Sequence, residues 1–146
     1  MSKSKNMMSD LQKKIPATYT AFSKYHFYAK ELISAFALKE GYLPLNPFMN
    51  WNYFLGDQVK RDLIVRANNN LILHADELWQ FGPIADGCYH EIVLAMKQGK
   101  KVRFFSVGKR VKDIRPIQIA ELEFEDELRK RIDVGEFIVK LKTYLL

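Results

Sequence analysis

The amino-acid sequence predicts an α/β domain: a parallel sheet of four or five strands with helices on both faces. Short β-prone segments alternate along the chain with amphipathic segments of about 13 to 20 residues, and this alternation is typical of βαβ units. Gly41 and Gly99 stand where two amphipathic segments end, as glycine commonly does at a helix C-terminus. Because the crossovers of parallel sheets are right-handed, we expect three layers in a flavodoxin-like arrangement.

The first half of the chain is expected to form two strands and two helices. In chain order these are strand 17–21, helix 22–40, strand 42–46, an aromatic loop at 47–53 and helix 54–73. Apolar residues at i, i+3 and i+4 spacing predict the first helix, with a face made of Ala29, Leu32, Ile33, Phe36 and Ala37. Pro44 has no backbone N–H to donate to a neighbouring strand, so strand 42–46 is not expected at the centre of the sheet.

The second half continues the alternation. The expected elements are strand 77–81, helix 86–98, strand 101–107, a fifth strand at 117–120 and a largely helical segment at 125–146. Gly82 and Pro83 end the third strand, since both residues interrupt regular structure. The length of 146 residues is typical of one domain. Residues 1–14 are polar and predict a flexible lead, so the single domain is expected to span residues 15–146.

Composition and short motifs exclude several classes of protein. One cysteine, Cys88, allows neither an intrachain disulfide framework nor a four-cysteine zinc site. The three histidines lack the spacing of metal ligands, and the chain contains no P-loop, no GxGxxG and no GxSxG, so we expect no metal and no cofactor. No apolar run approaches the roughly 18 residues of a membrane span, and the N-terminus lacks the apolar core of a signal peptide. We therefore expect a cytoplasmic protein with no membrane partner.

The net charge of +6 permits an anionic ligand but does not demand one. Basic residues crowd one stretch, residues 100–115, and acidic residues crowd the next, residues 121–127. Neighbouring blocks of opposite charge are most often solvated faces that partly neutralise each other. The alternative is a nucleic-acid interface on residues 100–115, which predicts an affinity that falls steeply with salt.

Ligands of parallel α/β sheets bind at the carboxyl ends of the strands, which here means the loops at 22–26, 47–53 and 82–87. Glu91 lies in the first two turns of the helix after the third strand, with Cys88, Ile92 and Ala95 on or beside its face. Its carboxylate is therefore directed toward the sheet edge as a site residue, or it is only a helix-start acid. The capping-box pattern is not met, because Cys88 occupies the capping position.

Other residues near the same edge have two interpretations each. Tyr19 is a core residue of the first strand, or its hydroxyl reaches a ligand. Asp86 is a turn or N-cap acid, and Gly87 is part of that turn or a point where backbone approaches a ligand closely. Ser23 and Lys24 are donors for a phosphate or solvent-exposed residues. Nearby aromatic side chains could stack a nucleobase or form core or a dimer interface, namely Phe48, Trp51, Tyr53, Phe54, Trp79 and Phe81.

Residues 16–107 resemble the nucleoside 2-deoxyribosyltransferase-like superfamily, which includes 2′-deoxynucleoside 5′-phosphate N-hydrolases and small bacterial and phage domains. The resemblance rests mainly on the stretch ADELWQFGPIADGCYHEIVLAMKQGKKVRFF. An aspartate opens the third strand, a Gly-x-x-x-Glu pattern begins the next helix, and Gly-Lys precedes the fourth strand. Here these are Asp76, Gly87 with Glu91, and Gly99 with Lys100.

The resemblance implies roles for individual residues. Glu91 matches the carboxylate that attacks the sugar anomeric carbon or activates water there, and Tyr19 matches the tyrosine that positions it. Asp86 matches a polar residue that binds substrate just before the glycine. Asn68 stands where relatives often carry a base-contacting aspartate, and an amide cannot supply a proton as a carboxyl group can. The substrate-binding candidates are then Ser23, Lys24, Asn68, Gly82 and Gly87, although the first loop, residues 22–24, lacks the glycine that relatives usually have there.

The resemblance therefore implies cleavage or exchange of the N-glycosidic bond of a nucleoside or nucleotide. A homo-oligomer, a dimer or larger, is also implied, because relatives build their sites at dimer interfaces. A catalytically inactive nucleotide-binding or sensing module is the first alternative, favoured by Asn68 and by the first loop. A basic nucleic-acid-binding protein is the second alternative.

Overall fold

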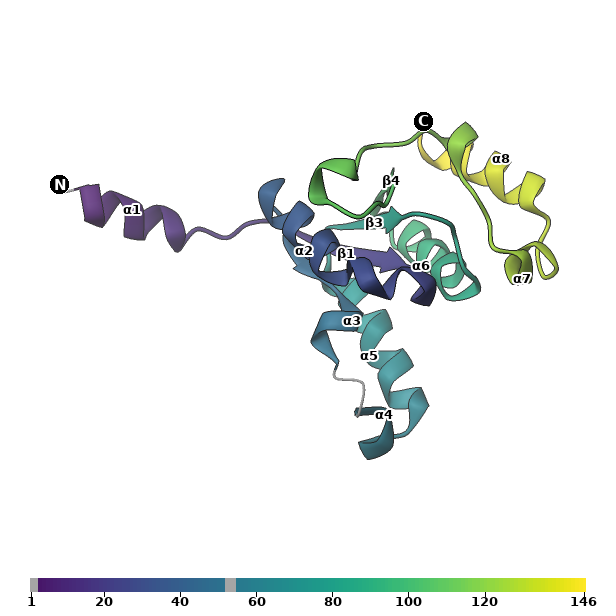
Figure 1. The fold of residues 1–146 in the computed structure, drawn as a ribbon, viewed down its shortest axis with the longest axis horizontal. Helices are drawn as coiled ribbons and strands as arrows, with labels where there is room; N and C mark the ends of the chain where they lie inside the picture. Colours follow the sequence, from purple (N-terminus) through teal and green to yellow (C-terminus); the bar gives the residue numbers. More distant parts are fainter. Residues whose placement is uncertain (1–2, 52–54) are drawn as a thin grey trace.

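The computed structural model describes residues 3–51 and 55–146, and within them the chain folds around a four-stranded parallel sheet (Figure 1). The strands are β1 (Ala17–Phe22), β2 (Leu43–Leu45), β3 (Glu77–Phe81) and β4 (Lys101–Phe105), in the order β2-β1-β3-β4. Helices pack on both faces. The predicted α/β class, parallel sheet and three layers are confirmed. Strand β2, which contains Pro44, lies at an edge as expected.

One face of the sheet is covered by the first crossover. It consists of the 3-10 helix η1 (Lys24–Ala29) and the helix α2 (Lys30–Lys39). The apolar side chains of this crossover, of the sheet face beneath it and of Ile114 from the segment after β4 form one core, which contains Phe22, Ala29, Ile33, Phe36, Ala37, Trp79, Phe81, Phe105 and Ile114. Its rings pack edge-on or stacked, with centroids of Phe36 and Phe105 5.1 Å apart.

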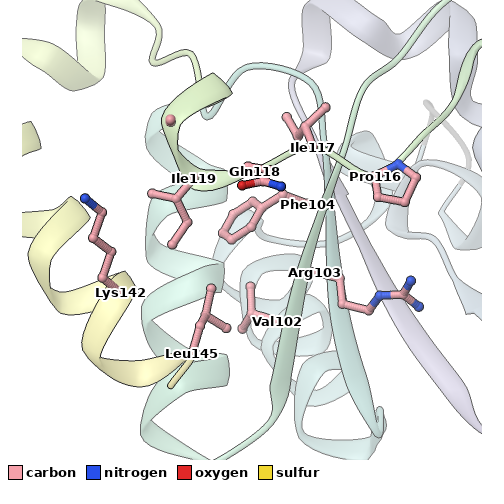
Figure 2. Close-up of a pocket in the computed structure, with 10 residues that line it drawn as sticks. Val102, Arg103, Phe104, Pro116, Ile117, Gln118, Ile119, Lys142 and Leu145 are labelled. Atoms are coloured by element: carbon pink, nitrogen blue, oxygen red, sulfur yellow. The ribbon is translucent and has the colours of Figure 1, made fainter.

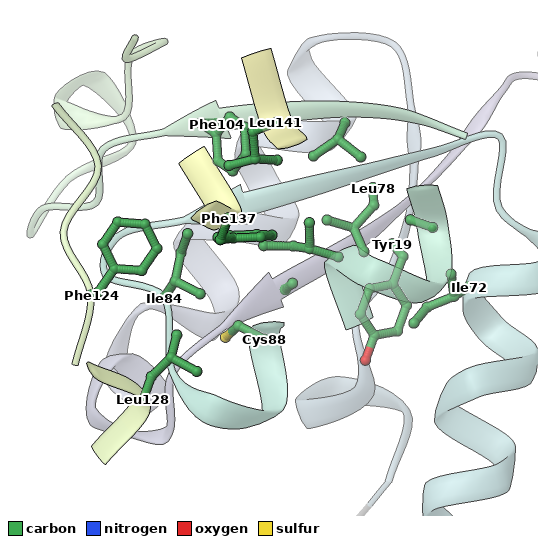
Figure 3. Packing of buried hydrophobic residues seen from close by; sticks show 14 of the residues in the cluster. Tyr19, Ile72, Leu78, Ile84, Cys88, Phe104, Phe124, Leu128, Phe137 and Leu141 are labelled. Atoms are coloured by element: carbon green, nitrogen blue, oxygen red, sulfur yellow. The ribbon is translucent and has the colours of Figure 1, made fainter. Parts of the chain in front are cut away.

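The opposite face carries a second and larger core (Figure 3). It is covered by α5 (Arg61–His74), α6 (Asp86–Lys97), α7 (Asp126–Arg129) and α8 (Val134–Tyr144). Leu78 of β3, Ile92 of α6 and Leu141 of α8 are all without solvent exposure in this cluster. The C-terminal helices therefore pack into the same domain as the sheet.

Several elements differ from the sequence-based expectation because tertiary contacts end them early. The expected fifth strand at 117–120 is wrong: Ile117 N–H donates to Phe104 O at 3.0 Å, but the chain then turns into the 3-10 helix η3 (Ile119–Glu121). Pro116 forms only an isolated bridge with Phe105, since proline has no N–H with which to extend a ladder.

The longer predicted helices are each divided. Helix 22–40 begins with the 3-10 turn η1, and helix 54–73 is split into α4 (Leu55–Gln58) and α5. Helix 125–146 is interrupted before Asp133, whose side chain accepts from Glu136 N–H at 3.1 Å and caps α8. The short helices α3 (Pro47–Asn50) and η2 (Val111–Asp113) complete the described elements. The expected loop 47–53 thus contains a short helix; its residues 52–53, and residue 54 at the start of the expected helix 54–73, lie outside the described residues.

The polar N-terminal segment contains a helix, α1 (Lys3–Leu11), which stands away from the sheet at the end of an extended connection (Figure 1). Its residues 7–11 are exposed. The segment expected to be a flexible lead thus contains a helix that lies outside the core. Among the described residues, no helix is both long and apolar enough to cross a membrane.

Candidate active site

A hydrogen bond between Tyr19 and Glu91 joins β1 to the second turn of α6: the tyrosine hydroxyl donates to Glu91 Oε2. Successive side chains of a strand point to opposite faces, so Tyr19 points with Ala17 and Ala21 toward the face under α6. Tyr19 has no solvent exposure, whereas Glu91 is partly exposed. Figure 3 shows the ring of Tyr19 beside Ile72 with its hydroxyl directed out of the apolar cluster. Two predicted site residues are therefore in direct contact.

The environment of Glu91 favours its protonated form. Burial raises the pKa of the Glu91 carboxyl group from 4.5 to about 7, although the hydrogen bond from Tyr19 acts in the opposite direction. Burial and the charge of Glu91 together raise the pKa of Tyr19 above its ordinary value, so its hydroxyl keeps its proton. The pair thus places a carboxyl group that titrates near neutral pH beside a permanent hydrogen-bond donor. Such a group is suited to acid, base or nucleophilic chemistry.

Cys88 lies one turn before Glu91 but is not suited to act as a nucleophile. Its side chain is buried, and burial and the charge of Glu91 raise the pKa of its thiol to about 12. The thiol form therefore dominates at neutral pH, and the thiol is the poorer nucleophile. Cys88 is a core residue here.

Gly87 leaves the surface next to Glu91 open. It precedes Glu91 by four residues on α6, so both lie on the same side of the helix. A Cβ atom placed on Gly87 would meet no atom within 4 Å. Helical side chains tilt toward the helix N-terminus, so the Glu91 side chain leans toward this open position. A ligand could approach the carboxylate from this side.

Gly82 has a structural role at the end of β3. Its φ of +71° is unfavourable for other residues, and a Cβ there would lie 2.9 Å from Val107 Cγ1. Its N–H donates to Phe105 O at 2.9 Å, which continues the pairing with β4. Glycine at this position is thus required by the turn that ends β3.

Gln80 is a residue of this edge that the sequence reasoning did not single out. It is fully buried on β3, and its Nε2 donates to the carbonyl oxygens of Phe81, Gly82 and Pro83 at 3.2–3.3 Å. These bonds hold the loop that leads into α6. The available signal was a single amide inside the apolar strand ELWQF, because a buried amide needs partners.

Asp86 is held by the C-terminal segment. Its Oδ2 accepts from Arg131 Nη1 at 2.8 Å, and its Oδ1 lies 3.8 Å from His90 Nε2. The ion pair links the first turn of α6 to the segment between α7 and α8. The structure thus gives Asp86 a different set of contacts from those of Glu91.

Asn68 lies on α5, the helix that packs beside α6. Its Oδ1 accepts from Trp51 Nε1 at 2.6 Å, and its side chain is partly exposed. Asn70, in the same run of asparagines, donates to Arg66 O at 2.9 Å on its own helix. Within residues 3–51 and 55–146, the amide of Asn68 thus joins α5 to the segment that follows α3.

Ser23 and Lys24 follow β1 at the carboxyl edge of the sheet. Ser23 is buried, and its Oγ accepts from Tyr25 N–H at 3.2 Å as the N-cap of η1. Lys24 is exposed, with its Nζ 5.5 Å from the centre of the Tyr25 ring. The hydroxyl of Ser23 is thus used by the backbone, whereas the ammonium of Lys24 faces solvent.

Two surface hollows lie elsewhere. The larger, of about 500 Å³, runs along the free edge of β4 and faces residues 116–120, Lys142 and Leu145 (Figure 2). The smaller, of about 230 Å³, lies between α6 and α8 and is lined by Tyr89 and Lys140 among others. Neither hollow is lined by Glu91, whose open side is the one next to Gly87. Among the described residues, no three His, Cys, Asp or Glu side chains gather as metal ligands would.

Asp76, which contributes to the resemblance, lies at the opposite, amino edge of the sheet. Its Oδ2 accepts from Ala17 N–H at 2.8 Å, and its own N–H donates to Ala17 O at 2.8 Å. These two bonds set the register between β1 and β3. Asp76 is a structural residue of the sheet.

Comparison with known proteins assigns the chain to a family without assigning a function. A search of curated proteins found no match. A family model described as a domain of unknown function, DUF7768, matches residues 15–105, which include β1, the whole of α6 and β4. The match contains both Tyr19 and Glu91 and covers more than half of the sequence. The chain therefore belongs to the DUF7768 family.

Proposed function

We propose that the protein cleaves or exchanges the N-glycosidic bond of a nucleoside or nucleotide, with Glu91 as the essential carboxylate. The observation that carries this proposal is the Tyr19–Glu91 hydrogen bond beneath the open surface at Gly87. A strand tyrosine and a helix glutamate with these positions in the chain are what the resemblance to the nucleoside 2-deoxyribosyltransferase-like superfamily implies. The contact supports this resemblance, because it joins the two residues that the resemblance pairs.

The chemistry requires a negative group close to the sugar. As the bond between the anomeric carbon and the base nitrogen breaks, positive charge develops on the sugar, and a nearby carboxylate stabilises it or forms a covalent ester with it. In exchange, a second base nitrogen then displaces Glu91; in hydrolysis, water does so and loses a proton. The departing base accepts a proton from solvent. Tyr19 acts as a positioning residue, because its hydroxyl holds one carboxylate oxygen and leaves the other free.

The raised pKa of Glu91 determines the expected pH dependence. As a nucleophile, Glu91 must be ionised, so kcat/KM should rise with pH and level off above about 7. As a general acid, Glu91 would have to be protonated, and the rate would fall over the same range. The direction of the pH profile therefore separates the two roles.

Glu91→Gln is the central variant for testing this proposal. Purified protein is incubated with a panel of deoxynucleosides and deoxynucleotides, with and without a second free base, and released or exchanged base is measured by chromatography. We expect release by the wild-type protein and by Glu127→Gln, an exposed glutamate on α7 that serves as the control. We expect base release by Glu91→Gln to be at least about a hundredfold slower, as is typical when one group that stabilises the transition state is removed. Unchanged release by this variant would reject the role of Glu91.

A nucleotide-binding module without catalysis is a second candidate, and one observation favours it. Asn68 stands where a carboxyl group would be expected, and Asp86 is paired with Arg131. A second acid next to Glu91, which glycoside hydrolases use to protonate the leaving group, is thus not supplied by either residue. Calorimetry with the same panel distinguishes the candidates, since heat of binding without released base supports the module.

The assembly and location of the protein are part of the same proposal. We propose a homo-oligomer, to be tested by sedimentation at several protein concentrations. We also propose a cytoplasmic location, where nucleotides are available and reducing conditions keep Cys88 a free thiol.

A further inference from the structure

Residues 24–30 form a surface that differs from the rest of the part of the chain that the structure describes. Every aromatic side chain that is classed as exposed within residues 7–51 and 55–146 lies there: Tyr25 is 67% exposed, Tyr28 57% and Phe27 45%. We name these three rings, with Lys24 and Lys30, the aromatic platform. Isolated exposed apolar residues need no explanation, but here three exposed rings fall within four consecutive positions.

The backbone of the platform is held in place. Ser23 caps η1, and His26 N–H donates to Ser23 O at 2.9 Å. Phe27 packs against Phe48 with ring centroids 5.5 Å apart, and Ala29 is fully buried beneath. The rings are therefore presented to solvent by an anchored turn, which lowers the entropy lost when a ligand binds them.

Lysine ammonium groups lie over two of the rings. Lys30 Nζ is 4.4 Å from the ring centre of Phe27, and Lys24 Nζ is 5.5 Å from that of Tyr25. Stacking surfaces beside cations bind ligands that combine flat rings with negative charge, and single-stranded nucleic acid has both in every nucleotide. Glu31, next in sequence, is exposed and is the acidic residue closest along the chain.

We propose that the aromatic platform binds single-stranded nucleic acid, with bases stacked on Tyr25 and Tyr28 and phosphates near Lys24 and Lys30. A second copy of this chain fits the platform less well. Symmetric packing of the platform on itself would bring its own lysines near their counterparts, with only Glu31 to offset them. The platform also differs from the basic stretch 100–115, which has more charge but no exposed ring.

Salt dependence separates the platform from the basic stretch. Binding to a single strand releases counterions, so the association constant K falls as salt rises. For each tenfold rise in salt concentration, log K falls by about 0.7 per phosphate that the protein neutralises. Two lysines therefore predict about a sevenfold loss of affinity between about 50 and about 200 mM salt. Seven basic residues at 100–115 would predict a loss of about a thousandfold over the same range.

Fluorescence anisotropy with labelled DNA and RNA strands of about 12 nucleotides tests the proposal, with duplex DNA as competitor. We expect binding to single strands, weaker binding to the duplex, and a loss of at least about fivefold in each of Tyr25→Ala and Tyr28→Ala. Tyr25→Trp should retain binding, because stacking needs a ring and not a hydroxyl. Leu38→Ala, at an exposed apolar position on α2, is the matched control for surface truncation.

Three results would overturn the proposal. One is no binding to single strands at low salt. Another is that the double variant Tyr25→Ala/Tyr28→Ala binds single strands with wild-type affinity, whereas substitution of Lys109 and Lys112 lowers this affinity. The third is a dimer, without nucleic-acid binding, that the double variant converts to monomers, which would assign the platform to self-association. The assay contains no cleavage step, so its outcome is independent of the role proposed for Glu91.

Discussion

The environment of Glu91 makes a prediction that needs no substrate: the protein should lose stability relative to Glu91→Gln as the pH rises. The pKa of Glu91 is raised in the folded protein from 4.5 to about 7, so the folded state holds a proton that the unfolded state releases. The stabilising effect is complete below about pH 4.5 and is lost as the pH rises through about 7. Glutamine keeps the shape and an acceptor for Tyr19 but does not titrate.

The magnitude follows from the separation of the two pKa values. The gap from 4.5 to about 7, at about 1.36 kcal/mol per pH unit, corresponds to about 3 kcal/mol. The free energy of unfolding of the wild-type protein minus that of Glu91→Gln should therefore fall by about this amount between pH 4.5 and pH 8. Other titrating groups affect both proteins equally and cancel in the difference.

Urea unfolding followed by circular dichroism at a series of pH values measures this difference. Glu127→Gln, at an exposed position, is the control and should show a much smaller dependence on pH than Glu91→Gln. A wild-type-minus-variant difference that stays constant within about 0.5 kcal/mol over the range would refute the reasoning. It would mean that the Glu91 carboxylate is solvated and not held against β1.

Three further predictions concern Tyr19, the glycine turns and the C-terminal helices. Tyr19→Phe removes the bond that lowers the pKa of the neighbouring carboxyl group, so the pH-dependent loss of stability should move to higher pH in the same urea series. Gly82→Ala should destabilise the protein more than Gly41→Ala. Both glycines have a positive φ, which costs an alanine about 1–2 kcal/mol, but only the Cβ at position 82 would contact Val107. Equal unfolding midpoints would contradict this. Leu141→Ala should lower the free energy of unfolding by about 2–5 kcal/mol, because Leu141 is fully buried against the core, and unfolding should remain one cooperative transition. A separate second transition would show that α8 folds independently.

The architecture could be predicted well because its signals are local. Short β-prone segments between amphipathic segments with a period of 3.6 identified all four strands and the principal helices, and Pro44 argued against a central position for β2. The errors fall where local signals compete with long-range contacts. Ile117 to Ala120 has a strand-like composition, yet Pro116 restricts its pairing with β4 to a single bridge.

The candidate site was predicted in part. Tyr19 and Glu91 were both singled out, and their contact is visible in the structure. Asp86 was grouped with them because the resemblance implies a substrate-binding polar residue there; in the structure its carboxylate is paired with Arg131, which is 45 positions away. Gln80 was overlooked because a strand pattern does not show which amide will have to hold a loop.

The sequence by itself determined the α/β class, the parallel order implied by alternating elements, and the two residues on which the proposed chemistry depends. The class and the parallel pairing follow from periodicity and residue type, which act over one or two turns of chain, and the roles of the two residues follow from the resemblance to a known superfamily. Only the tertiary structure decided that the Tyr19 hydroxyl reaches Glu91, that burial brings the carboxyl pKa to about 7, and that three rings remain in solvent beside β1. Those properties depend on how much of its hydration each group loses on folding. Hydration in turn depends on how distant segments pack together, and Tyr19 and Glu91 are 72 positions apart.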